Sequence, residues 1–310
     1  MTAYKLGFQR YERRLAQPLR TNHGVTAMRQ GIIVTLTDAA GRQSQGEIAP
    51  LTQFGTETVE QAIALCEGFG ARVTTDDIYS ISEEYPACQF GFGSALMGFE
   101  WQPEIQPIPP EMLCQLIPRT EDLRKTNPEQ LQQLIATGHD TFKIKIHRGD
   151  IHREIAFCEQ ILELLPSFAK LRLDANGRLA IAEAEKLFQW ANQKSQIDFI
   201  EQPFPPNQHK DTLIFQQKYR TAIALDESVC TIASLKAYYT PDSPFIYVLK
   251  PAIMGFPSQL KEFCEINPGA DLVFSTVFET EIGHQFVTRL AQSFGKDRAF
   301  GFGGKHWFLD

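Results

Sequence analysis

The sequence predicts an α/β fold, in which a parallel TIM-like barrel of the (β/α)7β type follows a smaller α+β domain. From residue 113 onward, short apolar runs alternate seven times with amphipathic helical stretches. The first hundred residues show an antiparallel strand pattern followed by helices. A proline-rich stretch, Gln102 to Pro110, stands between these two patterns. We place the α+β domain at residues 1–105 and the barrel at residues 106–310, and expect the C-terminal tail to return to the first domain.

The α+β domain is predicted from its strand and helix patterns. Residues 31–37 alternate as a strand does, Asp38 to Gly41 is a polar turn sequence, and residues 45–49 supply a returning strand. Helical patterns follow at residues 59–68 and 83–97, where apolar residues recur at steps of three and four. A small antiparallel sheet with helices packed on it is the expected arrangement.

The barrel is predicted from the repeated unit of strand and helix. The expected strands are residues 113–117, 142–146, 171–174, 199–201, 223–226, 245–250 and 272–276, with a short eighth strand near Phe300. The expected helices are residues 128–136, 153–165, 180–191, 213–219, 232–239, 257–265 and 284–293. A doubly wound open sheet is the alternative, but no glycine-rich phosphate turn follows the first strand, and seven consecutive units favour a barrel.

Composition and charge narrow the classes of function. The chain has 310 residues, a hydrophobic fraction of 43% and a charged fraction of 22%, as folded globular proteins have. A net charge of −7 argues against nucleic acid and anionic membranes as partners, and no apolar segment has the length of a signal peptide core or a membrane span. Six scattered cysteines without a CxxC pair favour a reducing, cytoplasmic location.

Two lysines stand on the inner face of an expected barrel strand. In Phe142 to Ile146 the apolar residues share one face, and Lys143 and Lys145 share the other. Because the outer face of a barrel strand packs on helices, both ammonium groups should project into the barrel. The alternative is a solvated edge strand, but a closed barrel has no edge.

The next three strands each end in a carboxylate. Asp174 follows Arg172 and precedes Asn176 on one inner face, Glu201 ends the next strand, and Asp226 ends the third. Their spacings, 201 − 174 = 27 and 226 − 201 = 25, are about one strand-helix unit each, so the acids should be neighbours at the barrel mouth.

Crowded carboxylates repel one another unless a cation lies between them. An all-oxygen ligand set predicts Mg²⁺, with Mn²⁺ possible, rather than zinc. Taken singly, each acid could be a helix N-cap, and Asp226 before a helix is a good candidate for one. A further lysine, Lys250, ends the following strand within an apolar run, where a solvent-facing charge has no place.

This order of residues resembles the enolase superfamily, in the branch that has lysines on both faces of the substrate. The motifs are Lys143-Ile144-Lys145, Asp174-Ala175-Asn176, Glu201-Gln202-Pro203, Asp226-Glu227-Ser228 and Leu249-Lys250-Pro251. The resemblance covers essentially the whole chain. It implies that the first domain is a capping domain, with a mobile lid at Leu19 to Gly24 that brings Arg20 and His23 to the substrate.

The resemblance also implies residue roles. Asp174, Glu201 and Asp226 would bind Mg²⁺, Lys145 would remove the proton next to the substrate carboxylate, and Lys250 would lie on the opposite face of the substrate. An ordinary lysine, with a pKa of about 10.4, is protonated at neutral pH. We expect Lys143, as a further catalytic lysine, and the metal to favour the neutral amine that a base requires.

Within the superfamily, the sequence is most similar to the o-succinylbenzoate synthase family. Those lyases dehydrate 2-succinyl-6-hydroxy-2,4-cyclohexadiene-1-carboxylate through an enediolate to 2-succinylbenzoate, in menaquinone or phylloquinone biosynthesis. The resemblance implies a small carboxylate substrate and slightly favours a monomer. The substrate-binding residues it suggests are Asn176, Arg172, Ser275, Thr276, Arg20 and His23.

Two alternatives stay open at this point. Dipeptide epimerases and N-acylamino acid racemases share the lysines and acids, but the epimerases generally carry an Asp-x-Asp late in the barrel. The corresponding stretch here, Phe300 to Gly304, has no acid. The other alternative is a barrel without catalytic activity that serves as a binding protein, against which the intact lysine and acid positions argue.

Overall fold

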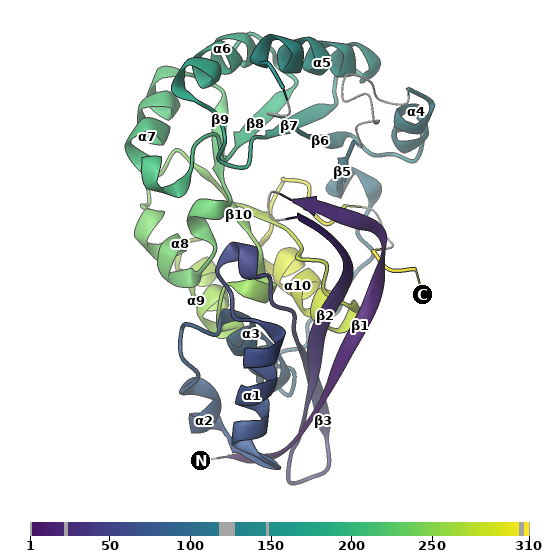
Figure 1. Cartoon of the computed structure of the whole chain (residues 1–310), viewed down its shortest axis with the longest axis vertical. Coiled ribbons are helices and arrows are strands. Elements are labelled where there is room, and N and C mark those ends of the chain that lie inside the picture. The colour runs from purple at the N-terminus through teal and green to yellow at the C-terminus, as the bar shows by residue number, and fades with distance from the viewer. Residues whose placement is uncertain (1, 22–23, 118–127, 147–148, 304–306, 310) are drawn as a thin grey trace.

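The computed structural model describes residues 2–21, 24–117, 128–146, 149–303 and 307–309. These residues form a four-stranded antiparallel sheet in the order β3-β2-β1-β4 and a seven-stranded parallel sheet in the order β11-β10-β9-β8-β7-β6-β5. The parallel sheet curls into a barrel with helices outside it, while the antiparallel sheet and the helices α1 to α3 lie together at the other end of the molecule (Figure 1). The predicted fold class is confirmed.

The antiparallel sheet is built on a long ribbon. Its strands are β1 (Ala3–Thr21), β2 (Gly24–Thr37), β3 (Gln43–Ile48) and β4 (Arg72–Thr74). The predicted turn is present, because the Asp38 amide donates to the Arg42 carbonyl and Gly41 adopts a φ of 80°, which glycine reaches without strain. Strand β1 was not predicted, because the charged residues of its middle part obscure the strand alternation.

The helices of the first part follow their sequence signals. They are α1 (Val59–Phe69), α2 (Thr75–Tyr79) and α3 (Pro86–Met97). Thr58 caps α1 through a reciprocal pair of bonds with Gln61, and Pro86 occupies the first turn of α3, where its missing N–H has no cost. For that reason α3 begins three residues later than the predicted start at residue 83.

The barrel strands match the predicted units closely. They are β5 (Cys114–Leu116), β6 (Thr141–Lys145), β7 (Lys170–Asp174), β8 (Ile197–Glu201), β9 (Ala222–Leu225), β10 (Ile246–Leu249) and β11 (Asp271–Phe274). The short eighth strand is also present, as parallel bridges from Phe300 to Leu113 and from Gly301 to Ser275. These bridges join the first and last strands, so residues 300–301 close the barrel.

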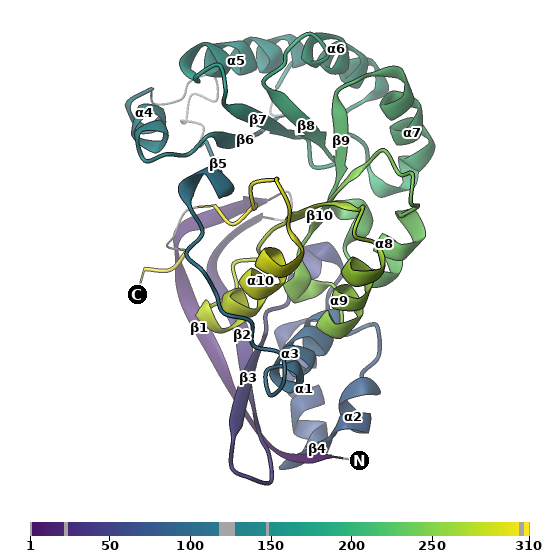
Figure 2. The same cartoon turned by 180° about the vertical axis from the view of Figure 1, so that it is seen from behind.

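Helices cover the outside of the barrel. They are α4 (Pro128–Ala136), α5 (Ile151–Leu164), α6 (Ile181–Ala191), α7 (His209–Lys218), α8 (Ile232–Tyr238), α9 (Pro257–Ile266) and α10 (Glu281–Phe294). From behind, α5, α6 and α7 again lie on the outer side of the strands (Figure 2). None of the helices described here is long and apolar enough to span a membrane.

Strand alternation separates two apolar layers. The main core contains outward-facing strand residues such as Ile144, Leu173 and Ile200, which pack against the helices. A separate small cluster inside the barrel consists of Phe199, Ala224, Ile246, Val248 and Val273. Glu201 and Lys250 lie two residues beyond Phe199 and Val248, on the same inner face. The apolar cluster therefore lies beneath the polar barrel mouth.

The antiparallel sheet contacts the barrel domain at several places, two of which involve the C-terminal tail and the start of α10. The tail returns to β1, where Leu15 bridges Phe308 and the Ala16 amide donates to the Trp307 carbonyl. On the other side, the fully buried Glu47 of β3 accepts hydrogen bonds from the Thr280 amide (2.8 Å), the Thr280 hydroxyl (2.6 Å) and the Gly283 amide (2.9 Å). Thr280 supplies no side-chain cap of its own to α10, so Glu47 caps this helix from the other sheet.

Replacing Glu47 by alanine should lower the free energy of unfolding by about 3 kcal/mol, because buried donors at the α10 N-terminus lose their acceptor. Urea denaturation of the two proteins measures this difference. Gln45→Ala, at an exposed position on the same strand, is the control and should change stability by less than about 0.5 kcal/mol. An equal, small effect of both substitutions would contradict the capping role.

Candidate active site

Three carboxylates meet at the ends of adjacent barrel strands. Asp174 is the last residue of β7, Glu201 is the last residue of β8 and pairs with Asp174 in register, and Asp226 directly follows β9. Their side chains are only 2%, 2% and 6% exposed. Consecutive parallel strands thus place all three acids side by side in the barrel mouth, as the spacing predicted.

Gln202 fixes the relation between two of these strand ends. Its side-chain oxygen accepts from the amides of Asp226 (3.0 Å) and Ser228 (3.1 Å), and its side-chain nitrogen donates to the Ser228 hydroxyl (2.7 Å). Gln202 has a φ of 39°, an uncommon value for a residue with a side chain. This buried amide connects the residue after Glu201 to the turn that carries Asp226.

Three lysines neutralise the carboxylates. The Lys143 ammonium lies between Asp174 (3.2 Å) and Glu201 (3.0 Å). The Lys145 ammonium contacts Asp174 (3.3 Å) and donates to the Asn176 side-chain oxygen (2.8 Å). On the far side, Lys250 donates to Asp226. The lysine pair and Lys250 therefore approach the acids from opposite sides, as the strand order predicted.

The first domain also reaches this site. Phe54, in the short 3-10 turn Thr52–Phe54, places its ring centroid 4.7 Å from the Lys250 ammonium nitrogen. An aromatic face stabilises a nearby positive charge, and it also excludes water from one side of the lysine. Phe54 and Asp226 together hold Lys250 in place.

Burial and charge together shift the pKa values of the cluster. Burial and the neighbouring Asp174 carboxylate raise the pKa of Glu201 to about 7, and burial outweighs Lys250 to raise the pKa of Asp226. Burial opposes ionisation of Asp174 as well, but Lys143 and Lys145 lower its pKa overall. Neighbouring Glu201 and Asp174 likewise outweigh burial and raise the pKa of Lys143. Three negative charges are costly here without compensating cations.

The chemistry of this cluster suits a hard divalent cation. All three acids supply oxygen, which Mg²⁺ and Mn²⁺ prefer, and their crowding favours a bound positive charge. The neighbouring Glu227 also has a buried carboxylate oxygen, Oε2, without a hydrogen-bond partner among the described residues. Within the described ranges, no three Asp, Glu, His or Cys side chains lie close enough together to hold a metal ion as they stand. The lysines occupy the space between the acids: Lys143 lies between Asp174 and Glu201, and Lys250 contacts Asp226.

Arg172 makes its described contacts inside the barrel, and substrate contact by this residue stays a prediction. Its guanidinium, on a side chain that is 2% exposed, donates to Asp198 (2.8 Å) and to the Ala299 carbonyl (2.8 Å) and stacks over Phe199. The register between β7 and β8 shifts at Asp198, so this residue is an extra one in its strand. Arg172 therefore belongs to an ion pair in the barrel interior.

The remaining predicted substrate residues differ in their surroundings. Asn176 joins the cluster through Lys145, as described above. Ser275 donates to the Gly301 carbonyl (3.1 Å) and Thr276 to Glu279 (2.8 Å), so both hydroxyls make local bonds after β11. His23 and the Arg20 side chain lie outside the described residues. Substrate contact by all five of these residues stays a prediction.

Sequence reasoning missed three residues of the site. Glu227 was noted only as the residue after Asp226, the possible helix cap, and Gln202 only as the residue after Glu201. Phe54 lies in the first domain, far from the barrel motifs in the sequence. A usable signal existed for Glu227 alone, because a second acid directly after the strand-end Asp226 is unusual unless it is solvated or paired. No period or spacing in the sequence indicates that Phe54 meets Lys250.

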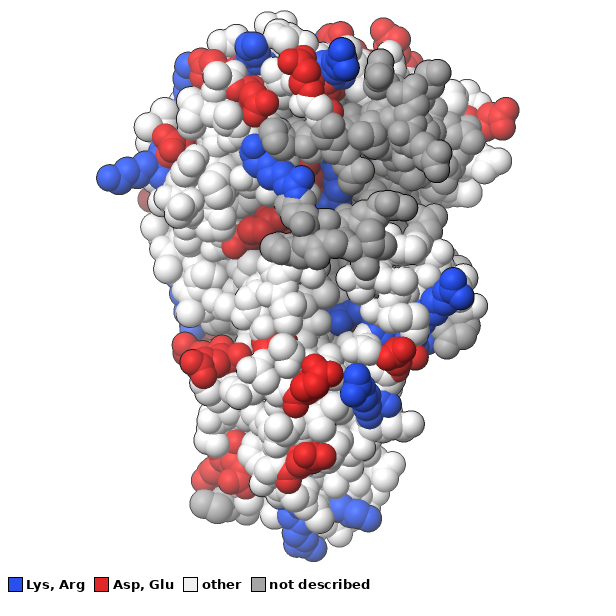
Figure 3. All heavy atoms as spheres, in the orientation of Figure 1, with Lys and Arg blue, Asp and Glu red and all other residues white. Residues whose placement is uncertain are grey.

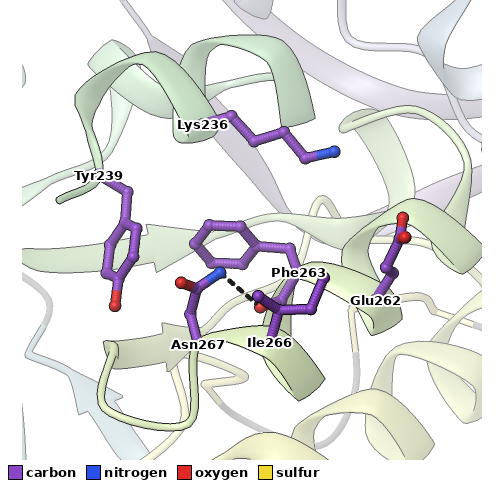
Figure 4. Close-up of a pocket in the computed structure, with 6 residues that line it drawn as sticks. All are labelled: Lys236, Tyr239, Glu262, Phe263, Ile266 and Asn267. Atoms are coloured by element: carbon purple, nitrogen blue, oxygen red, sulfur yellow. Dashed lines mark hydrogen bonds between the residues drawn. The ribbon is translucent and has the colours of Figure 1, made fainter. Parts of the chain in front are cut away.

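A separate hollow lies on the outer surface of the barrel (Figure 4). It has a volume of about 300 Å³ between α8 and α9 and is lined by Lys236, Tyr239, Glu262, Phe263, Ile266 and Asn267. The face of the molecule in Figure 3 shows acidic and basic side chains interspersed, without a broad area of one sign in its described part. Neither feature gathers reactive groups as the barrel mouth does.

Both parts of the chain match known protein families. Residues 7–99 match the family described as MenC, N-terminal domain, and residues 127–255 match the enolase C-terminal domain-like family. The o-succinylbenzoate synthase of Thermosynechococcus vestitus is 36% identical over 302 residues, which cover 96% of this chain and 91% of that protein. This chain belongs to the o-succinylbenzoate synthase family. The predicted superfamily and family are thereby confirmed.

Solved structures and a more distant relative fit this family assignment. The crystal structure of o-succinylbenzoate synthase from Thermosynechococcus elongatus, complexed with Mg in its active site, superposes with a TM-score of 0.86 at 33% identity, covering 98% of this chain and 97% of that one. A dipeptide epimerase from Methylococcus capsulatus shares the fold, with a TM-score of 0.79 at 19% identity and coverage of 94% and 87%. The o-succinylbenzoate synthase of Aliivibrio salmonicida is 29% identical over 85% of this chain and 78% of its own length.

Proposed function

We propose that this chain is an o-succinylbenzoate synthase, a lyase that dehydrates 2-succinyl-6-hydroxy-2,4-cyclohexadiene-1-carboxylate to 2-succinylbenzoate. The observation that carries the proposal is the placement of Lys145 and Lys250 on opposite sides of three buried carboxylates. The family match over both parts of the chain supports it. The reaction belongs to the biosynthesis of menaquinone or phylloquinone.

Lys145 is the proposed base. As the neutral amine, it takes the proton from the carbon next to the substrate carboxylate, and the electron pair of that C–H bond enters an enediolate. The resulting Lys145 ammonium then donates its proton to the departing hydroxyl on the same face. The C–O bond breaks, water leaves, and the electron pair of the enediolate completes the aromatic ring. One lysine thus carries both proton transfers.

Lys250 has a different task. Asp226 and the Phe54 ring both favour its charged form, so it supplies a fixed positive charge close to the developing enediolate. The Lys250 side chain is only 12% exposed. Because little water screens its charge, its attraction for the negative charge of the enediolate is stronger than it would be at the surface. A residue that holds charge in this way need not exchange a proton during the reaction.

Asp174, Glu201 and Asp226 are the proposed ligands of Mg²⁺, for which Mn²⁺ could substitute because it accepts the same oxygen ligands. When bound, the cation stabilises the negative charge that grows on the substrate carboxylate. The three acids hold this position rigidly, because each ends or directly follows a barrel strand.

The described site is completed within one chain, since the capping residue Phe54 and the barrel lysines belong to the same molecule. We therefore propose a monomer that acts on a small carboxylate in the cytoplasm. Substrate selection is assigned to the barrel mouth and to the lid segment 19–24.

The proposed function is tested by incubating the purified protein with the cyclohexadiene carboxylate and Mg²⁺. Aromatic absorbance should appear with time, since the product alone contains a benzene ring. A folded, metal-supplemented protein that gives no aromatic product would refute the assignment.

A further inference from the structure

We propose that Glu227 and Asn176 form a positioning pair that holds the amine of Lys145 in its reactive place. The inference rests on the proposed function and extends it to two residues that do not themselves touch the reacting atoms. Asn176 is thereby moved from the predicted substrate-binding residues to the support of the base.

The pair is defined by consecutive hydrogen bonds. Lys145 Nζ donates to Asn176 Oδ1 at 2.8 Å, and Asn176 Nδ2 donates to Glu227 Oε1 at 3.0 Å. The residues come from three strand ends, β6, β7 and β9, so the chain of bonds crosses the barrel mouth. Lys145 has four rotatable side-chain bonds, and its contact with Asn176 is shorter than its contact with Asp174 (3.3 Å).

Chemistry fixes the direction of the Asn176 amide. Lys145 donates as the ammonium, and as the neutral base it still has N–H bonds to donate while its lone pair faces the substrate. An ionised carboxylate only accepts, so the amide oxygen faces Lys145 and the amide nitrogen faces Glu227. If Glu227 offered no acceptor, a flipped Asn176 amide would sacrifice only its hydrogen bond to Lys145. The flipped amide would then turn an N–H group toward the lysine. Glu227 therefore controls which group Asn176 offers to the base.

The backbone is arranged for this role. Asn176 has a φ of 46°, in the left-handed region that asparagine tolerates better than most residues, and its amide donates to Asp174 Oδ1 at 3.1 Å. Glu227 begins the short 3-10 turn Glu227–Val229, and no side-chain cap bond is made at the start of that turn. Its carboxylate thus serves Asn176 rather than a helix end.

The second oxygen of Glu227 is consistent with this purpose. Oε2 is buried and has no hydrogen-bond partner among the described residues. Burying a carboxylate without satisfying both oxygens is costly for stability, which argues against a purely structural reason for this residue. A positioning role in the site explains why a hydrogen-bond acceptor for Asn176 is held at this buried place.

The test uses substitutions that exchange the hydrogen-bonding roles. In Asn176→Asp, the new carboxylate still accepts from Lys145 but faces Glu227 with like charge, so kcat should fall about 100-fold. Glu227→Gln should cost only about threefold, because the glutamine oxygen still accepts from Asn176. The double variant restores a donor opposite the new Asp, and kcat should recover to within about tenfold of the wild type.

Several measurements separate positioning from general damage. The KM for the cyclohexadiene carboxylate should change less than about threefold in each variant, because the bound substrate is not contacted. Asn176→Gly keeps the left-handed backbone and removes the amide; its thermal midpoint should stay within about 4 °C while kcat falls about 100-fold. Asn192→Asp, at the end of α6, is the matched control and should match the wild type.

The outcomes are distinguishable from failure of the proposed function. A wild-type enzyme without synthase activity would refute that function. An active wild type with unimpaired Asn176→Asp and Asn176→Gly variants would overturn the positioning role. A double variant no better than Asn176→Asp alone would do the same, since the exchange of roles is what predicts the rescue.

Discussion

Lys145→Ala is expected to lower kcat for aromatisation of the cyclohexadiene carboxylate by at least about a thousandfold. The substitution removes the group that both takes the α-proton and protonates the departing hydroxyl, and no other described base stands on that side of the carboxylates. Lys143, the nearest alternative, is held in its charged form between Asp174 and Glu201. The loss is measured as the initial rate of appearance of aromatic absorbance.

Arginine substitutions provide the matched control for this prediction. Arginine keeps a positive charge but does not act as a base at neutral pH. Lys250→Arg should therefore retain more activity than Lys145→Arg, because Lys250 supplies charge alone. Equal and complete loss in both variants, with folding intact, would indicate that each lysine transfers a proton, as racemisation requires.

Removal of the divalent metal is the second change with a large expected effect. Excess chelator should reduce turnover by about a thousandfold or more, and added Mg²⁺ or Mn²⁺ should restore it, because the developing charge loses its main stabilisation. Asp174→Ala, Glu201→Ala and Asp226→Ala should each be impaired to a similar degree. Magnesium affinity measured by titration calorimetry should fall in the same variants.

Asp198→Asn supplies the control for the carboxylate substitutions. Asp198 is an acid of the same barrel but pairs with Arg172 and Arg298, so its loss should affect stability and leave magnesium affinity unchanged. Full turnover in the presence of excess chelator would exclude the metal assignment. Undiminished magnesium affinity in Glu201→Ala would exclude Glu201 as a ligand.

Much of the site was predictable because strand alternation is a local property. The side chains of Lys143 and Lys145 face the same way as each other, and the acids recur once per strand-helix unit, so a barrel closes them into one mouth. The closure at residues 300–301 was also foreseeable from a short apolar run at the right distance. These inferences need only the order of residues along the chain.

The rest depends on contacts between distant segments. The Phe54 ring meets Lys250 only because the first domain folds over the barrel mouth, and no pattern in either segment encodes that approach. Arg172 shares the inner face of Asp174, so alternation places it inside the barrel but does not identify its partner. Asp198, the partner of Arg172, is an extra residue at a register shift. A pattern of regular strand alternation cannot predict such a shift.

The most direct test of the proposed synthase activity gives the enzyme three substrates in deuterated water: the cyclohexadiene carboxylate, a dipeptide and an N-succinylamino acid. The account predicts rapid formation of o-succinylbenzoate from the first, with little or no deuterium entering the α-positions of the other two. Rapid α-deuterium exchange into the amino acid substrates, with no aromatic product, would contradict the synthase activity and leave a racemase or epimerase on the same fold.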